Sequence, residues 1–389
     1  MSVFGVISEF NPFHNGHRYL FEAARARGAD TVVCVMSGNA VQRGEIAIAE
    51  KHVRAKMALD SGADLVLELP FPWSASSAES FAACGVRIAS QFADNLIFGS
   101  ECGDISALER AADIVKDSDF ISEYKERSRG NCGSAQSYFD LLSEKTGMTY
   151  SSNDILGIEY IKAAKVQGSS LGFETVKREG GAYNSTAIED GSLQSASAIR
   201  TLIMQGDTHD LTSYMPKRCA EMLAEAKDIG ELAFSHRIEN AQKLYFRMIS
   251  PDTLFDIADT QGGLANRICR AALECVEGSM LELLRTKRYT DARIRRAMLF
   301  CLTGVRREDI NATPVYTNLL AANQKGRELL AAKRKSAGIA VLAKPADIPD
   351  TAEAKRQAEL SFKLDSIFAM ALEKQTDVAS IVARSPIIV

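Results

Sequence analysis

The first 205 or so residues alternate short apolar stretches with amphipathic ones, and this alternation constrains the fold more than any other feature of the chain. The apolar stretches have the length and composition of buried strands, and they cover residues 3–7, 31–36, 64–69, 95–98 and 171–176. Stretches with helical periodicity lie near residues 17–27, 50–60, 76–91, 104–116, 134–145 and 154–166. Because buried strands alternating with helices form parallel sheets covered on both faces, we predict an α/β fold with a Rossmann-like parallel sheet.

Beyond about residue 206 the strand pattern fades and helical periodicity dominates. The predicted helices cover residues 217–229, 231–249, 264–285, 291–304, 316–336 and 352–373, with one short strand-like stretch at 339–342. A chain of 389 residues is longer than most single cores sustain. We therefore predict two domains, an α/β domain over residues 1–210 and a mainly α-helical domain over residues 211–389.

The composition excludes several classes of protein. No apolar run approaches the roughly 20 residues that a membrane span requires, and the N-terminus enters a strand directly, so we expect a cytoplasmic protein without a membrane partner. The eight cysteines are scattered without metal-ligand spacing, which predicts reduced thiols, and we assign no metal ligand. The net charge of −4 means that a nucleic-acid partner would need a local basic patch.

Two histidines, His14 and His17, lie where the first predicted strand gives way to the first predicted helix. The start of a helix carries unpaired backbone N–H groups and the positive end of the helix dipole, so it stabilises an anion such as a nucleotide phosphate. Gly16 removes a side chain and lets a phosphate approach the backbone. The alternative is that a histidine at a helix start hydrogen-bonds only to the backbone.

A second anion site is predicted where Ser195, Ser197 and Arg200 begin another helix. Hydroxyl groups and a guanidinium group in the first turns of a helix can hold phosphate oxygens, although either serine alone could simply cap the helix. Together with the histidine pair, this segment favours phosphate chemistry.

The histidine pair and the later serine-arginine segment resemble the nucleotidyltransferase superfamily, whose members attack the α-phosphate of a nucleotide and release pyrophosphate. More narrowly, several segments resemble the tRNA(Met) cytidine acetate ligase family, and they lie at residues 9–17, 36–39, 41–45, 67–70, 77–82, 98–101, 152–160, 287–290 and 293–296. One departure is Gln194-Ser195-Ala196, where many superfamily members have Ile-Ser-Thr or Ile-Ser-Ser, and it leaves open which hydroxyl contacts phosphate.

The resemblance implies an ATP-dependent ligase that activates acetate as acetyl-adenylate and then acetylates the exocyclic amine of the wobble cytidine of elongator tRNA(Met). His14 and His17 would be the catalytic residues, acting as electrostatic stabilisers at the α-phosphate rather than as nucleophiles. Mg²⁺ is expected to accompany the nucleotide. The resemblance further implies an ATP site in the first domain, formed by Ile7, Ser8, Glu9, Phe10, Asn11, Pro12, Phe13, Asn15, Gly16, Leu20, Gly99, Asn153, Arg178, Ser195, Ser197 and Arg200.

From the residues alone, three members of this set have other interpretations. Gly99 could be only a turn, Asn153 could cap a helix, and Arg178 could lie in solvent. In the loop after the second strand, Arg43 is predicted to contact acetate or phosphate. The charges that follow on the next helix are interpreted as a solvated face, and they are Lys51, His52, Arg54 and Lys56.

A basic cluster over residues 285–296 predicts tRNA binding by the second domain. It contains six basic residues and one acidic residue, Asp291, and such a patch can neutralise RNA phosphates. Tyr289 is predicted to stack on an unpaired base, and a second basic stretch at 325–335 to extend the footprint. Solvated helix charges are the alternative. The predicted tRNA-binding residues are Lys287, Arg288, Tyr289, Arg293, Arg295 and Arg296, of which the last three are expected to point largely outward.

Two other functions fit part of the pattern. An adenylyltransferase that joins ATP to a small phosphorylated cofactor precursor would use the same histidine pair but would leave the basic cluster unexplained. A non-catalytic RNA-binding protein would use the basic cluster but would not need both histidines. The sequence makes no prediction of the oligomeric state.

Overall fold

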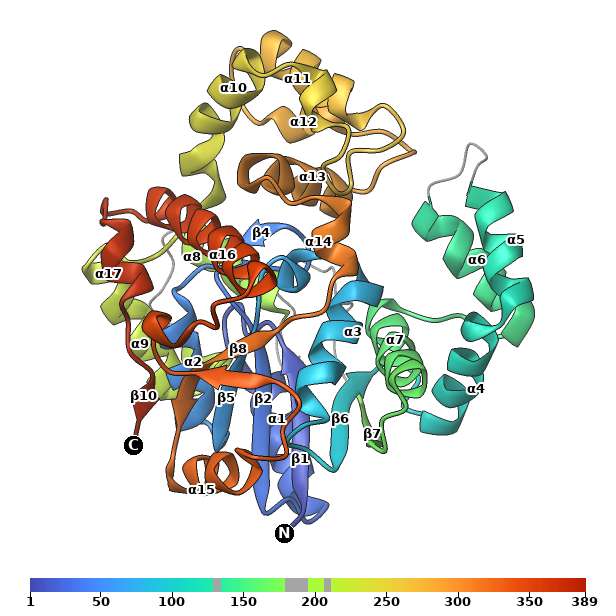
Figure 1. The fold of residues 1–389 in the computed structure, drawn as a ribbon, viewed down its shortest axis with the longest axis vertical. Coiled ribbons are helices and arrows are strands. Elements are labelled where there is room, and N and C mark those ends of the chain that lie inside the picture. The colour runs from blue at the N-terminus through green and yellow to red at the C-terminus, as the bar shows by residue number, and fades with distance from the viewer. Residues whose placement is uncertain (129–133, 179–194, 206–210) are drawn as a thin grey trace.

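The computed structural model describes residues 1–128, 134–178, 195–205 and 211–389, and its centre is one eight-stranded sheet (Figure 1). The strands are ordered β10-β8-β5-β2-β1-β6-β7, and β9 pairs with β8. Neighbouring strands from β5 to β7 are parallel, whereas β8 is antiparallel to β5. The strand bounds are β1 (Val3–Ser8), β2 (Thr31–Ser37), β5 (Leu65–Leu69), β6 (Asn95–Ser100), β7 (Gly172–Lys177), β8 (Tyr316–Ala322), β9 (Ala340–Leu342) and β10 (Ile387–Ile388). The predicted α/β class is confirmed.

Helices cover both faces of the sheet because successive strand residues point to opposite faces and both sets are apolar. One core joins β1, β2 and β5 to α3, α4 and α7, and another joins the opposite side chains to α1, α2, α8 and α9. The helices of this part are α1 (Asn15–Ala26), α2 (Lys51–Asp60), α3 (Ala78–Ala89), α4 (Ile105–Lys116), α5 (Ser118–Ser128), α6 (Ser134–Thr146), α7 (Ser152–Gln167), α8 (Ala196–Met204) and α9 (Lys217–Asp228). The α5 helix was not predicted.

The later part of the chain builds a third core, at the top of Figure 1, and then returns to the sheet. Its helices are α10 (Glu239–Met248), α11 (Leu264–Glu274), α12 (Met280–Leu284), α13 (Asp291–Thr303), α14 (Arg307–Asn311), α15 (Gln324–Lys333), α16 (Ala352–Ala371) and α17 (Val378–Val382). Among the described residues, no helix combines the length and the apolar content needed to cross a membrane.

The helix predicted over residues 316–336 is wrong in its first half, which forms β8. The segment pairs with the edge of β5, and Thr317 donates a hydrogen bond of 2.6 Å to the backbone carbonyl oxygen of Glu68. Such long-range pairing overrides local helical periodicity. The predicted domain boundary at residue 210 lies outside the described residues and stays a prediction, but strands β8 to β10 show that the end of the chain completes the sheet of the first part.

A short hairpin projects from the carboxyl edge of the sheet and reaches the third core. It consists of β3 (Ala40–Val41) and β4 (Glu45–Ile46), and its turn contains Gly44 at a positive φ of 71°. A Cβ atom at Gly44 would lie 2.5 Å from the backbone nitrogen of Arg296 in α13, so only glycine permits this approach. The hairpin therefore carries Arg43 and Glu45 to a position between the sheet and α13.

The charged residues of α2 are not a solvated face, contrary to prediction, because distant segments supply partners for them. Lys51, His52 and Arg54 are buried. The guanidinium group of Arg54 donates to four backbone carbonyl oxygens, those of Ala49, Glu9, Ser37 and Gly38. The Lys51 ammonium lies 3.1 Å from a carboxylate oxygen of Glu68 in β5 and 3.8 Å from one of Asp365 in α16.

Candidate active site

The two histidines form a stacked pair at the start of α1. Their ring centroids are 3.7 Å apart with an interplanar angle of 28°. The Nδ1 atom of His14 accepts a hydrogen bond of 3.1 Å from the backbone N–H of Gly16, and the Nδ1 atom of His17 accepts one of 3.2 Å from the backbone N–H of His14. Beneath them, the buried Phe13 ring packs 5.3 Å from the His17 ring, centroid to centroid.

These hydrogen bonds determine which ring nitrogens carry protons. A neutral imidazole whose Nδ1 accepts a hydrogen bond has its proton on Nε2, so each ring offers one Nε2–H donor. Burial, together with the positive charge of Arg178, lowers the pKa of His14 to about 3. Burial likewise lowers the pKa of His17 well below its usual range, helped by His14 and Arg178. The pair is therefore neutral at physiological pH, so what it can offer an anion is two N–H donors rather than positive charge.

The first backbone N–H groups of α1 already have partners within the protein. The N–H of Asn15 donates to the backbone carbonyl oxygen of Tyr214 at 2.9 Å, that of Gly16 to His14, and that of His17 to the carbonyl oxygen of His14 at 2.9 Å. The expected phosphate contact to free backbone N–H groups is thus wrong for these three residues. Gly16 instead leaves room for the His14 ring, because a Cβ atom there would lie 2.9 Å from its Cε1 atom.

Arg200 ties the serine-arginine segment to the loop that precedes the histidines. Its Nη1 atom donates a hydrogen bond of 2.8 Å to the backbone carbonyl oxygen of Asn11, and its Nη2 atom donates one of 3.3 Å to the Ser197 hydroxyl. The Ser195 hydroxyl caps α8 by accepting from the backbone N–H of Ala198 at 3.2 Å. The two segments predicted to hold phosphate are therefore adjacent. Of the Ser195 and Ser197 hydroxyls, that of Ser197 lies beside the Arg200 guanidinium group.

Both segments line one pocket at the carboxyl edge of the sheet. Four members of the predicted ATP set lie outside its lining: Pro12 and Phe13 are buried, Gly16 underlies the His14 ring, and Asn15 donates from its side chain to the carbonyl oxygen of Ser213. The predicted residues that line it are Ile7, Ser8, Glu9, Phe10, Asn11, His14, His17, Leu20, Arg43, Gly99, Asn153, Arg178, Ser195, Ser197 and Arg200. Lining residues that the sequence did not single out are Phe81, Phe98, Leu156, Tyr160 and Ala196, which carry only the signal of core residues, and Gln42 and Glu45.

Glu101 organises the far wall of this pocket. It accepts a hydrogen bond of 2.5 Å from the Asn153 side chain and lies 3.7 Å from the Nε atom of Arg178. Gly99 leaves room for the Arg178 side chain, because a Cβ atom at residue 99 would lie only 3.2 Å from the Arg178 Cγ atom. Asn153 and Arg178 are thus held by a shared carboxylate at the edge of the pocket.

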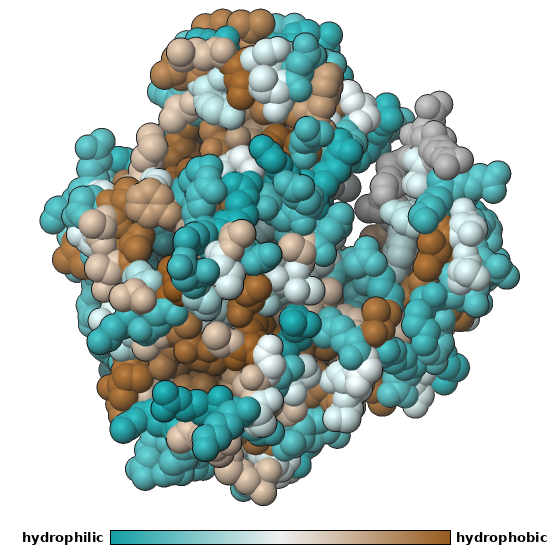
Figure 2. Space-filling model, in the orientation of Figure 1, coloured by the Kyte–Doolittle hydropathy of each residue, from teal (hydrophilic) through white to brown (hydrophobic). Residues whose placement is uncertain are grey.

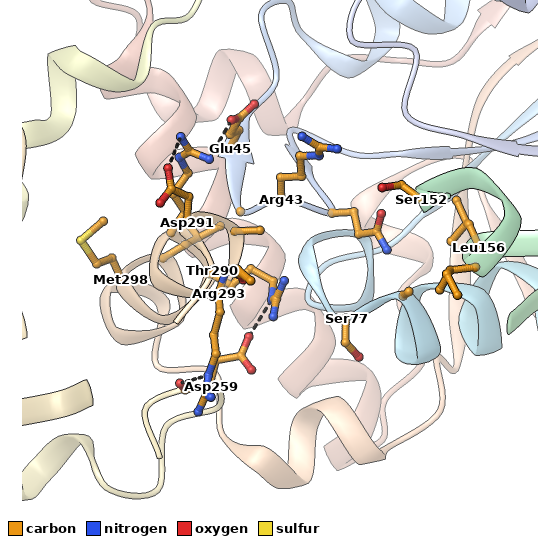
Figure 3. A pocket seen from close by; sticks show the side chains of 18 of the residues that line it. Arg43, Glu45, Ser77, Ser152, Leu156, Asp259, Thr290, Asp291, Arg293 and Met298 are labelled. Carbon is orange, nitrogen blue, oxygen red and sulfur yellow. Dashed lines mark hydrogen bonds and ion pairs between the residues drawn. The ribbon is translucent and has the colours of Figure 1, made fainter. Parts of the chain in front are cut away.

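The pocket opens into a larger cleft between the hairpin, α7 and α13 (Figure 3). Gln42, Arg43, Glu45, Asn153, Leu156, Ser197 and Arg200 line both cavities. One side of the cleft, which we call the arginine wall, consists of Arg285, Arg288, Arg293, Arg295 and Arg296.

Most of the arginine wall is paired rather than pointing freely outward as predicted. Arg285 lies 2.8 Å from Asp291, and Arg296 lies 2.6 Å from Asp259 with its side chain only 13% exposed. Arg293 donates to the backbone carbonyl oxygens of residues 259 and 261. The wall is therefore a fixed array of guanidinium groups, with Arg288 and the neighbouring Lys287 exposed.

The structure contradicts the stacking role predicted for Tyr289, and it places the second predicted basic stretch away from the cleft. The Tyr289 ring is 5% exposed, donates to the backbone carbonyl oxygen of Gly262, and is covered by the guanidinium groups of Arg288 and Arg293, so it offers no face to a base. The basic stretch at 325–335 includes α15, where Lys325 donates to the carbonyl oxygen of Asp30 just before β2. In Figure 1, α15 lies at the amino edge of the sheet, whereas the residues that line the pocket follow the carboxyl ends of the strands.

Comparison with known proteins shows extensive similarity. A model of the HIGH Nucleotidyl Transferase family matches residues 1–380. The tRNA(Met) cytidine acetate ligase of Acetivibrio thermocellus is 36% identical over 395 residues, which cover 95% of each protein, and that of Thermoanaerobacter sp. strain X514 is 32% identical over the full length of both.

Solved structures show the same likeness. Thermotoga maritima TmcAL without ligand superposes with a TM-score of 0.92 at 30% identity, over 100% of each chain. The same enzyme bound with alpha-thio ATP superposes with a TM-score of 0.90 at 30% identity, over 100% of this chain and 99% of the other.

Proposed function

Because this chain belongs to the HIGH nucleotidyltransferase family and, within it, to the tRNA(Met) cytidine acetate ligases, we propose that it activates acetate with ATP and acetylates the wobble cytidine of elongator tRNA(Met). One observation carries the chemistry. The histidine pair and Arg200 line a single pocket, and this pocket opens into a cleft with an arginine wall. An activated acyl group formed in the pocket can therefore meet an RNA bound in the cleft.

In the first step, a carboxylate oxygen of acetate attacks the α-phosphorus of ATP, and pyrophosphate leaves with the bonding electrons. The Nε2–H groups of His14 and His17 donate to α-phosphate oxygens, whose negative charge grows as phosphorus gains its fifth neighbour. Arg200 and the hydroxyl of Ser197 hold the outer phosphates, which become pyrophosphate. Arg43, which lines both cavities, contacts acetate or phosphate from the hairpin.

In the second step, the exocyclic amine of cytidine attacks the acetyl carbonyl carbon, the bond to the phosphate oxygen breaks, AMP leaves, and the amine nitrogen loses one proton to solvent. The guanidinium groups of the arginine wall neutralise phosphates near the reacting nucleotide. Mg²⁺ accompanies ATP in such reactions and supplies charge neutralisation to the phosphates. Among the described residues, two carboxylates line the pocket: Glu45 is paired with two arginines, and Glu9 accepts a hydrogen bond from the backbone N–H of Gln42 while burial raises its pKa. Phosphate oxygens and water would therefore be the main ligands of the ion.

The test is acetylation by the purified protein with ATP, Mg²⁺, acetate and a tRNA(Met) transcript, followed by nucleoside mass spectrometry. We expect acetylcytidine in amounts that match the pyrophosphate released, and none in a transcript whose wobble cytidine is replaced by uridine. Absence of acetylcytidine would contradict the proposal. A dinucleotide formed without RNA would support the adenylyltransferase alternative. The cytoplasm, where tRNA is found, is the location we propose.

A further inference from the structure

One carboxylate joins the nucleotide pocket to the arginine wall. The Oε2 atom of Glu45 lies 3.0 Å from the Nη2 atom of Arg200, and its Oε1 atom lies 3.3 Å from the Nη1 atom of Arg295. The three side chains are 22%, 17% and 30% exposed, respectively. Arg200 and Arg295 lie 95 positions apart in sequence, and their guanidinium groups share the single, partly buried carboxylate of Glu45.

The hairpin fixes the position of this carboxylate from both ends. At its tip, the backbone of Gly44 approaches the backbone of Arg296 more closely than any side chain would allow. At its base, the N–H of Ala47 donates to the carbonyl oxygen of Asn39 at 3.0 Å, and the Asn39 side chain donates to Asp365 at 2.8 Å. The backbone of Glu45 is therefore held between the two arginines, and only its side chain can shift from one to the other.

Glu45 lies against one terminal nitrogen of each arginine. The Nη1 atom of Arg200 is engaged by the carbonyl oxygen of Asn11, and its Nη2 atom by Glu45 and Ser197. The Nη1 atom of Arg295 lies 3.3 Å from Glu45, and its Nη2 atom lies 4.0 Å from Asp291, so Glu45 is the nearer of its two carboxylate partners. A phosphate that binds tightly to either guanidinium group must therefore compete with Glu45 for it.

When one anion takes one arginine, Glu45 keeps the other as its partner. When anions take both arginines, the carboxylate loses both partners while it remains largely buried and lies near two phosphates. An unpaired charge in such a position is costly. An anion bound at Arg200 therefore weakens the binding of a second anion at Arg295, and the reverse also holds.

We propose that Glu45 is a positioning residue that makes the triphosphate at Arg200 and an RNA phosphate at Arg295 compete, so that RNA binds most tightly after pyrophosphate has left. This inference rests on the proposed function for the two anion sites. It assigns an order to the substrates: with ATP bound, Glu45 pairs with Arg295 and weakens RNA binding. Once pyrophosphate leaves, Glu45 returns to Arg200, and Arg295 becomes available to the RNA.

The test measures the dissociation constant of tRNA(Met) at fixed salt for protein alone, with saturating nonhydrolysable α,β-methylene ATP, and with saturating AMP. For the wild type we expect the triphosphate analogue to weaken tRNA binding at least fivefold, which is within the usual range of coupling between two sites, and AMP to weaken it less than twofold. By reciprocity, tRNA must weaken binding of the analogue by the same factor. In the E45Q variant we expect the ratio of tRNA dissociation constants with and without analogue to fall to about one.

D259N is the matched control, because it removes the same charge from the arginine wall, at Arg296, without touching Arg200. Asp259 has a positive φ of 62°, which asparagine also tolerates, so the substitution conserves the backbone. D259N should keep the wild-type ratio, and R295M, which cuts the other link of Glu45, should lose it while binding tRNA more weakly throughout.

An unchanged ratio in E45Q, or a wild-type protein whose tRNA affinity does not respond to the analogue, would overturn the inference. Both measurements are of binding, so they separate this inference from the proposed function. Failure of acetyl transfer with the coupling intact would remove only the proposed reaction, and acetyl transfer without the coupling would remove only the role of Glu45.

Discussion

Arg200 donates a hydrogen bond of 2.8 Å to the backbone carbonyl oxygen of Asn11, across 189 positions of sequence. The loop that carries the histidine pair is thus fixed by a side chain from a helix that begins at residue 196. Because the same guanidinium group also contacts Ser197 and Glu45, it joins three separate segments of the chain in the pocket.

An R200K substitution tests this geometry. A lysine ammonium keeps the charge but lacks the planar fork that reaches Asn11 and Glu45 together. We expect the rate of acetate-dependent ATP–pyrophosphate exchange to fall by about 100-fold, in line with loss of a preorganised donor. R306K, which alters an exposed ion pair with Glu308, serves as the control and should exchange at the wild-type rate. Equal exchange by R200K and the wild type would contradict the role of Arg200.

Replacing either histidine by asparagine tests the two Nε2–H donors. Asparagine is shorter, so it withdraws the donor from the phosphate, and we expect adenylate formation to fall by about 100- to 1,000-fold for H14N or H17N. The dissociation constant of tRNA should change less than twofold, because neither ring lies on the arginine wall. If both variants form acetyl-adenylate at the wild-type rate, the histidines have no catalytic role.

The depressed pKa of His14 predicts how stability depends on pH. Its folded pKa of about 3 lies below the ordinary value of 6.5, so below pH 6.5 the unfolded chain binds a proton that the folded protein does not. Stability contributed by neutral His14 is therefore present above pH 6.5 and is lost as the pH falls toward 3. At pH 5 the loss from this residue is about 2 kcal/mol, from 1.36 kcal/mol per pH unit.

Urea denaturation at pH 7.5 and at pH 5 provides the measurement. The wild type should lose about 2 kcal/mol more of its unfolding free energy than H14N between these two pH values, since the acidic groups and His17, whose pKa is lowered mainly by its own burial, are present in both proteins. Equal losses in the two proteins would show that His14 titrates normally in the folded state.

The buried charges beneath the hairpin predict a stability effect far larger than that of a surface pair. In K51M, the carboxylates of Glu68 and Asp365 lose the ammonium group that lies between them. Removing one partner from a buried ion pair costs about 3 to 5 kcal/mol, so the urea midpoint should fall sharply. K56M removes a lysine from the same helix whose pairing with Asp60 is partly exposed, and it should cost less than about 1 kcal/mol. Similar losses in both variants would contradict the structure around Lys51.

The parts of the fold that could be predicted are those that local sequence determines. The histidine pair, the parallel strands and the capped start of α8 follow from periodicity and residue type over a few positions. Residues whose partners come from distant segments could not be predicted. The sequence around Lys51 gives no sign of its partner Asp365, and the sequence around Tyr289 gives no sign that its hydroxyl donates to the carbonyl oxygen of Gly262. For the same reason the segment at residues 41–45 drew attention to Arg43 and not to Glu45, because both arginines that pair with Glu45 come from distant helices.

The revised RNA surface makes a prediction that separates the arginine wall from the basic stretch on α15. Arg288 is exposed and lies in the cleft, so R288Q should weaken tRNA(Met) binding about three- to tenfold and reduce the slope of log affinity against log salt concentration by about one. K325Q removes an equal charge at the opposite edge of the sheet, where Lys325 contacts Asp30, and should leave both affinity and slope unchanged. Filter binding over a range of salt concentrations measures both quantities. If K325Q lowers the slope while R288Q does not, the RNA lies on the amino edge of the sheet and cannot reach an acetyl group formed beside the histidines.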